Sequence, residues 1–176
     1  MIPSNLILLA ENSEDDELLF LDALKRSGLN HPVIVVPDGQ EAIAYFKGDS
    51  RYVDRDRFPL PTVLLLDLAM PKVDGWQVLQ WIRLRAEFNH VLVVVLTVST
   101  RVADLQQAYR MGANSFLVKP CTVDDLLNLE RAFPKHWHKN ETAERAAGKY
   151  WQKDGWQKNR RPPDRGKRGK TILAKK

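Results

Sequence analysis

The chain contains very little cysteine and no long hydrophobic run. Its 176 residues include a single cysteine, Cys121, so no disulfide can form within the chain. That thiol and four dispersed histidines make a poor set of zinc ligands, and we expect Cys121 to be an ordinary packing residue. No stretch approaches the roughly 18 apolar residues that span a bilayer. Residues 1–10 also lack the basic flank and long apolar core of a secretory signal, so the expected location is cytoplasmic.

Acidic and basic residues separate along the chain. The apolar share of 44% and the charged share of 28% are close to globular averages, which disfavours a disordered or fibrous class. Residues 1–134 hold 13 Lys and Arg against 18 Asp and Glu, a net charge of −5, whereas residues 135–176 hold 14 against 4, a net charge of +10. We therefore expect one domain over residues 1–134 and a basic C-terminal extension over residues 135–176.

The basic extension has one helical pattern and then few apolar residues. The helical spacing is carried by Ala143, Ala146, Ala147, Tyr150 and Trp151. Beyond Gly155 the apolar content is too low for independent folding, and we expect disorder. Basic residues near Trp151 and Trp156 would suit nucleic-acid binding, but no nucleic-acid-binding motif is visible. A solvated or partner-binding extension is therefore favoured over a nucleic-acid partner.

The acidic body alternates short apolar runs with helical patterns, which is typical of βα units in a parallel sheet. The expected strands, rich in Val, Ile and Leu, cover residues 6–10, 33–36, 63–66, 91–96 and 116–118. Ser13 with Asp16, and Thr122 with Asp125, have the spacing of helix N-terminal caps, and Gly28 and Gly112 follow helical patterns where a left-handed cap would end them. Residues 48–61 are interpreted as an ordered surface loop that covers the sheet edge. The predicted class is a doubly wound α/β fold.

Polar residues follow four of the five expected strands. In order along the chain they are Glu11 with Asn12, then Asp67, Thr97 and Lys119. In an open α/β sheet the carboxyl ends of the strands meet at one edge, where ligands bind. A carboxylate, an acidic partner, a hydroxyl and an ammonium would therefore be brought together.

Five segments of the chain resemble the successive signatures of response-regulator receiver domains. They are LILLAENSEDD, VPDGQEA, LLLDLAMPKVDGWQVL, VVVLTVST and GANSFLVKP, and together they cover about residues 5–133. The long loop before the third strand is similar to that of single-domain regulators paired with phytochrome-type histidine kinases. The resemblance implies a flavodoxin-like receiver fold with strand order 2-1-3-4-5.

The resemblance also implies a role for each residue at the strand ends. Asp67 would accept a phosphoryl group from a phosphohistidine, while Lys119 and Thr97 would contact the phosphoryl oxygens. Mg²⁺ would bind Asp67, the pair Glu11 and Asn12, and the backbone carbonyl of Ala69. Two further residues have switching roles: Pro120 would aim the lysine through a cis peptide bond, and Phe116 would turn inward as Thr97 moves.

The sequence departs from the receiver pattern at two positions. Asn12 stands where such domains carry a second acid, so we expect weakened Mg²⁺ binding and slow or incomplete phosphorylation. Asp15 and Asp16 are not expected to replace it, because they lie in the first helical turn, where acids favour the helix dipole. Val98 follows Thr97 where a small residue is common, and it would either shield the acyl phosphate from water or merely pack.

Several other polar and aromatic residues carry weaker signals. Trp81 is interpreted as a packing residue and Trp76 is left open as a partner contact. His136 and His138 lie two residues apart, which suits neither a helical metal pair nor a catalytic dyad, so both are expected to be solvated.

The chain is predicted to be a phosphoacceptor response regulator rather than an enzyme. Its expected partners are a histidine kinase or phosphotransfer protein, a downstream protein, and a second copy of the chain. Asp67 lacks the acid two residues later that haloacid-dehalogenase-type phosphatases use, which disfavours a hydrolase. Two alternatives stay open: a phosphorylation-independent interaction module, and a nucleic-acid-associated regulator acting through the basic extension.

Overall fold

A computed structural model of the chain describes residues 5–137. The predicted helix near residues 143–151, the predicted disorder beyond Gly155, and the side chains of His138, Trp151 and Trp156 lie outside the described residues. Among residues 5–137, no helix is both long enough and apolar enough to cross a membrane.

Five parallel strands form one sheet. They are β1 (Ile7–Ala10), β2 (Val33–Val36), β3 (Val63–Asp67), β4 (Leu92–Thr97) and β5 (Ser115–Val118). Their order is β2-β1-β3-β4-β5, and all neighbouring pairs are parallel. The predicted order is confirmed, and every strand boundary lies within one residue of the expected one.

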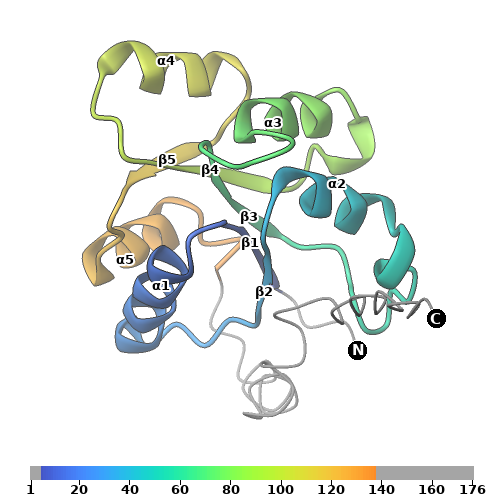
Figure 1. Cartoon of the computed structure of the whole chain (residues 1–176). Coiled ribbons are helices and arrows are strands. Elements are labelled where there is room, and N and C mark those ends of the chain that lie inside the picture. The colour runs from blue at the N-terminus through green and yellow to red at the C-terminus, as the bar shows by residue number, and fades with distance from the viewer. Residues whose placement is uncertain (1–4, 138–176) are drawn as a thin grey trace, which may run out of the picture.

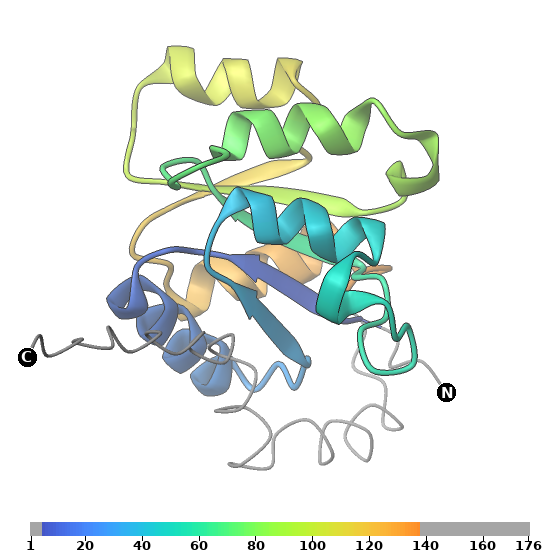
Figure 2. The same ribbon diagram turned by 45° about the vertical axis from the view of Figure 1, so that its right-hand side comes forward.

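The helices cover both faces of the sheet. They are α1 (Glu14–Ser27), α2 (Gly39–Lys47), α3 (Gly75–Arg83), α4 (Val102–Arg110) and α5 (Val123–Ala132), with two 3₁₀ turns at Ser50–Tyr52 and Ala86–Phe88. Figures 1 and 2 show α1 and α5 on one face and α2, α3 and α4 on the other. This is the doubly wound arrangement that the sequence predicts.

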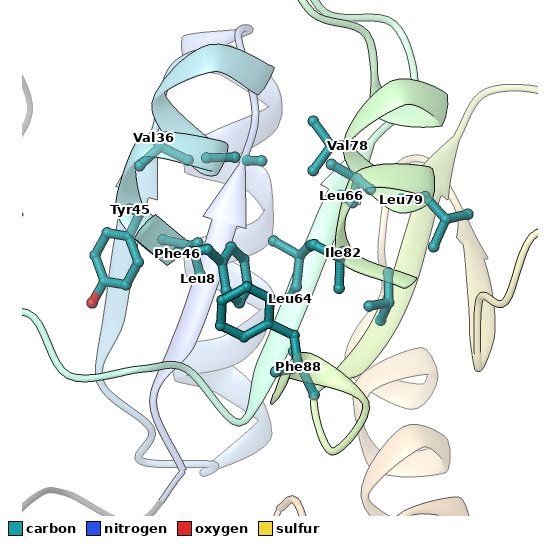
Figure 3. Packing of buried hydrophobic residues seen from close by; sticks show 14 of the residues in the cluster. Leu8, Val36, Tyr45, Phe46, Leu64, Leu66, Val78, Leu79, Ile82 and Phe88 are labelled. Atoms are coloured by element: carbon teal, nitrogen blue, oxygen red, sulfur yellow. The ribbon is translucent and has the colours of Figure 1, made fainter. Parts of the chain in front are cut away.

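The strands are apolar on both sides because both sides are buried. In β1, Leu8 packs toward α2 and α3, whereas Leu9 belongs to the cluster under α1 and α5. Figure 3 shows the first cluster, where Leu8, Leu64 and Leu66 meet side chains of α2 and α3. A fully buried aliphatic side chain contributes about 1.5–3 kcal/mol, so these strands hold the sheet rigid beneath the loops at its carboxyl edge.

The predicted helix caps are present. The Ser13 hydroxyl accepts a hydrogen bond from the backbone N–H of Asp16, and Thr122 and Asp125 form a reciprocal capping box. Gly28 ends α1 with a φ of 74°, and Gly112 adopts a φ of 97° after α4. Both glycines therefore take the left-handed conformation that other residues rarely adopt.

Residues 48–61 cover the sheet edge and also contribute side chains to the hydrophobic core. Tyr52 and Phe58 are buried and pack with Tyr45 of α2 at ring-centroid distances of 4.9 and 6.2 Å. The Tyr52 hydroxyl donates to the Glu41 carboxylate at 2.7 Å, and Arg51 pairs with the same oxygen at 2.7 Å. The segment is therefore a continuation of the core on the α2 face.

His31 and Trp137 form a buried pair in the part of the chain that precedes β2 and follows α5. His31 is 2% exposed and Trp137 is fully buried, and their rings meet edge to face at 5.4 Å. Within residues 5–137, neither His31 nitrogen has a hydrogen-bond partner. Burial lowers the pKa of His31 to about 4, so the ring is neutral at physiological pH. The boundary at residue 134 stays a prediction, but Trp137 belongs to the core.

Candidate functional site

The residues predicted at the strand ends meet in one pocket of about 220 Å³ at the carboxyl edge of the sheet. Those that line it are Glu11, Asn12, Asp67, Ala69, Thr97 and Lys119, together with Ser13, Asp16, Leu68 and Val98. Every residue to which the sequence assigned a phosphoryl or metal contact is therefore present in a single hollow.

Asp67 is the last residue of β3 and is only 4% exposed. Its Oδ1 accepts a hydrogen bond from the backbone N–H of Ala69 at 3.0 Å. Its Oδ2 lies 3.1 Å from the Lys119 ammonium. The carboxylate is thus held in a fixed direction at the pocket floor by the turn after its own strand and by the end of β5.

Lys119 is surrounded by three carboxylates. Its Nζ lies 2.5 Å from Glu11, 2.9 Å from Asp16 and 3.1 Å from Asp67. Burial by itself lowers the pKa of Lys119, but the hydrogen bonds to the three acids outweigh that effect and raise the pKa above its usual value. The ammonium is therefore fully charged at neutral pH and ties β1, α1 and β3 to the end of β5.

Asp16 lies in the acidic first turn of α1, as expected, and it also contacts the site. Its carboxylate reaches back from the first turn of α1 to Lys119 and lines the pocket. The spacing to Asn12 is one helical turn, and α1 begins at the same sheet edge as the predicted site. The spacing between Asn12 and Asp16 was the sequence signal for this contact, but it could be interpreted only once the direction of α1 was known. Asp16 thus adds an acid on the lysine side of the pocket.

Asn12 directs its side-chain amide toward the oxygens predicted to hold a metal. In the amide orientation that satisfies both contacts, the nitrogen donates to the Ala69 carbonyl at 3.0 Å and to Asp67 Oδ2 at 3.2 Å. The residue as a whole is exposed, so water reaches the outer side of the amide.

The oxygens around Asn12 fit a hard divalent ion. The Asp67 carboxylate and the Ala69 carbonyl both lie within 3.2 Å of one atom, and Asn12 would add an oxygen by turning its amide. Residues 5–137 contain no group of three or more His, Cys, Asp or Glu side chains arranged as metal ligands. The oxygen atoms of Asp67, Ala69 and Asn12 suit Mg²⁺, which is commonly held by one or two carboxylates and keeps several waters.

Thr97 ends β4 with its hydroxyl at the pocket. Its Oγ1 accepts from the backbone N–H of Ser99 at 2.9 Å, which leaves the hydroxyl proton free to donate to an incoming oxygen. Val98 is 78% exposed and lines the same pocket, so the interpretation that it merely packs is wrong. Shielding of an acyl phosphate by Val98 stays a prediction.

The two predicted switch residues lie within β5 and just after it. The Lys119–Pro120 peptide bond is cis, as expected. Phe116 is half-buried and packs edge to face on Tyr109 of α4 at 5.8 Å. The ring thus connects β5 with α4, and its movement during signalling stays a prediction.

The weaker candidates lie away from the pocket or are held in the fold. Trp81 stacks between Phe88 and the Arg85 guanidinium, which confirms its packing role, and Trp76 is also half-buried against the core. His136 is not simply solvated, because its Nε2 lies 3.3 Å from the His90 carbonyl oxygen. Burial raises the pKa of Cys121 to about 11, so its thiol is a poor nucleophile at neutral pH.

Gly75 lets α3 begin directly against the backbone of Asp67. A Cβ at this position would lie 2.3 Å from the Asp67 carbonyl oxygen and 2.7 Å from the Leu68 Cα. We expect Gly75→Ala to lower the free energy of unfolding by about 2 kcal/mol and to displace the phosphoacceptor turn. Urea unfolding of the parent and the variant measures the loss. If the Asp67 carboxylate of Gly75→Ala reacted as readily as that of the parent, the predicted displacement of the turn would be contradicted.

Known proteins share this pocket-bearing fold. Residues 7–130 match the response regulator receiver domain family. Response regulator Rcp1 of Synechocystis sp. is 33% identical over 135 residues, which cover 77% of this chain and 90% of Rcp1. Its Mn²⁺-bound crystal structure matches with a TM-score of 0.62 at 32% identity, over 77% of this chain and 96% of that one.

Two further solved structures belong to phytochrome response regulators. The bacteriophytochrome response regulator AtBRR matches with a TM-score of 0.68 and 36% identity, over 78% of this chain and 97% of that one. The phosphorylated cyanobacterial phytochrome response regulator RcpA matches with a TM-score of 0.63 and 30% identity, over 77% and 94%. The family match spans most of the described fold and its strand-end pocket, so this chain belongs to the response regulator receiver domain family of two-component signalling proteins.

Proposed function

We propose that this receiver domain accepts a phosphoryl group on Asp67 from a phosphohistidine of a histidine kinase or phosphotransfer protein. The observation that carries the proposal is the meeting of Asp67, Lys119 and Thr97 in one pocket. A buried carboxylate with an ammonium and a hydroxyl beside it supplies a nucleophile and two groups to share phosphoryl charge. Signalling would then pass to another protein by contact, without turnover of a substrate.

The transfer needs position and charge neutralisation more than covalent help. An Asp67 oxygen forms a P–O bond while the P–N bond of the phosphohistidine breaks, and the imidazole nitrogen leaves with the bonding pair. Lys119 pairs with a phosphoryl oxygen, and the Thr97 hydroxyl donates to another. A bound Mg²⁺, held by Glu11, Asn12, Asp67 and the backbone carbonyl of Ala69, would neutralise further negative charge on the phosphoryl group.

The relatives support these assignments by their names. RcpA has been solved in a phosphorylated form and Rcp1 with Mn²⁺. Because Rcp1, RcpA and AtBRR are response regulators and two of these names specify phytochromes, we propose a phytochrome-type histidine kinase as the partner.

Phosphorylation of the full chain by acetyl phosphate and Mg²⁺ tests the proposal. We expect mass spectrometry to find one phosphoryl group on the parent and none on Asp67→Asn, because the amide is not a nucleophile. Circular dichroism of both proteins checks that the variant is folded. Equal labelling of the two proteins would move the acceptor away from Asp67.

A phosphorylation-independent interaction module is the second candidate. The amide of Asn12 against Asp67 and Ala69 favours it, since these oxygens already have donors. A folded parent that stays unlabelled at saturating acetyl phosphate and Mg²⁺ would support this candidate over phosphoryl transfer.

A further inference from the structure

We propose that Asn12 makes the resting pocket independent of a metal ion: its amide nitrogen donates to the same oxygens that would otherwise hold the ion. The pocket therefore exists in two states, one closed by the amide and one in which the amide has turned to admit a divalent ion. The consequence for phosphorylation rests on the proposed function, but the two states do not.

The first support is the geometry of Asp67. Its Oδ1 accepts from the Ala69 N–H, and its Oδ2 contacts both the Lys119 ammonium and the Asn12 amide. The carboxylate thus has three donors from the protein itself. Since an unpaired buried oxygen is costly, these donors stabilise the resting carboxylate, and a cation must compete with them to bind.

The second support is the Ala69 carbonyl. It faces the same amide nitrogen at 3.0 Å, so one NH₂ group, which has two donors, satisfies both oxygens. An aspartate at position 12 has no donor and would place a third oxygen against these two. The residue type at this position therefore decides whether the resting pocket satisfies itself or needs a cation.

The third support is the distribution of charge. Glu11, Asp16 and Asp67 are all within 3.1 Å of Lys119. The acid that is missing at position 12 is thus balanced by Asp16, which lies on the lysine side. Asp67 is consequently held by Lys119 and Asn12 together, and a metal ion must compete with both.

A metal ion can enter only if the amide rotates and gives up two hydrogen bonds. Such a loss weakens binding on the order of 10-fold, and an aspartate at position 12 would reverse it while adding a charged ligand. The exposure of Asn12 keeps the rotation open, because water can solvate the amide as it turns.

The test uses Asn12→Asp in the full chain, with Asn89→Asp as a matched control. Asn89 is exposed and precedes β4, at the end of that strand opposite Thr97. In EDTA we expect Asn12→Asp to unfold at a Tm about 3 °C below the parent. In a Mg²⁺ titration followed by tryptophan fluorescence and by Tm, its midpoint should lie at least about 10-fold lower than that of the parent. Asn89→Asp should change neither quantity.

Asn12→Ala separates the lost amide from the added charge. We expect it to lower the Tm in EDTA by about 1–2 °C, because Asp67 and Ala69 lose a donor and no charge is introduced. A Tm equal to that of the parent would overturn the proposal. So would a Mg²⁺ midpoint that Asn12→Asp leaves unchanged.

These outcomes are independent of phosphoryl transfer. If Asp67 never accepts a phosphoryl group but the Asn12 variants behave as expected, the proposed function fails and the amide-closed state stands. If Asp67 is phosphorylated but Asn12→Ala and Asn12→Asp match the parent in both measurements, the proposed function stands and the amide-closed state fails.

Discussion

Lys119→Met should lower the free energy of unfolding by about 3–5 kcal/mol at neutral pH. The side chain is 9% exposed and pairs with Glu11, Asp16 and Asp67, of which Glu11 and Asp67 are 1% and 6% exposed at their side chains. Methionine keeps much of the length and removes the charge, so three carboxylates would face one another without a cation. Removing one partner of a buried ion pair is costly because the other charge stays buried.

The pH dependence of the stability of Lys119→Met tests the same ion-pair cluster. The folded-state pKa of Lys119 is raised above the ordinary value of 10.5, so its contribution is complete at neutral pH and disappears only as the pH rises above that value. The difference in stability between Lys119→Met and the parent should become smaller as the pH falls from 7 to 5, because protons relieve the repulsion among the carboxylates that have lost their cation. Urea unfolding of both proteins at both pH values measures this difference.

Lys72→Met is the matched control for the lysine prediction. Lys72 pairs with one carboxylate, Asp38, at 2.7 Å, and its own side chain is 59% exposed. We expect a much smaller loss of stability, because solvent screens an exposed ion pair. Equal losses for the two variants would show that the three-carboxylate cluster does not depend on its lysine.

Acidification from pH 7 to pH 4 should destabilise the parent by about 3 kcal/mol through His31 alone. Burial lowers the pKa of His31 from 6.5 to about 4, and neither ring nitrogen has a hydrogen-bond partner in the part of the chain that the structure describes. The unfolded chain therefore binds a proton more readily than the folded one. The contribution is complete above pH 6.5 and is lost progressively as the pH falls toward 4.

His31→Phe isolates this contribution, because phenylalanine keeps an aromatic ring against Trp137 and cannot be protonated. Acidification from pH 7 to pH 4 should lower the unfolding free energy of the variant by about 3 kcal/mol less than it lowers that of the parent. His90→Gln, which removes an exposed histidine, is the matched control and should not reproduce this difference. Parallel profiles for the parent and His31→Phe would contradict the prediction.

The sheet and most of the site were predictable because they depend on local patterns. The apolar run at residues 63–66 is buried on both faces, as expected for a strand of a parallel sheet between two helical layers. Once the strands are known, the meeting of Glu11, Asp67, Thr97 and Lys119 follows, since carboxyl ends of parallel strands share an edge.

The remaining features depend on directions that no sequence pattern carries. Asp16 points into the pocket because of the direction in which α1 leaves β1. The acidic first turn of the helix does not reveal that direction in the sequence. The contact of the Asn12 amide depends on a side-chain rotation. Trp137 lies beyond the last helical pattern, and its burial depends on a surface formed by residues distant in the sequence.

The crowding around Lys119 also sets the order in which contacts must change. One ammonium cannot keep three carboxylate partners and gain a phosphoryl oxygen as well. Glu11 and Asp67 are nearly inaccessible to water, whereas the Asp16 side chain is 36% exposed and can exchange the ammonium for solvent at the lowest cost. The Lys119–Asp16 ion pair, which joins the start of α1 to the end of β5, should therefore break first.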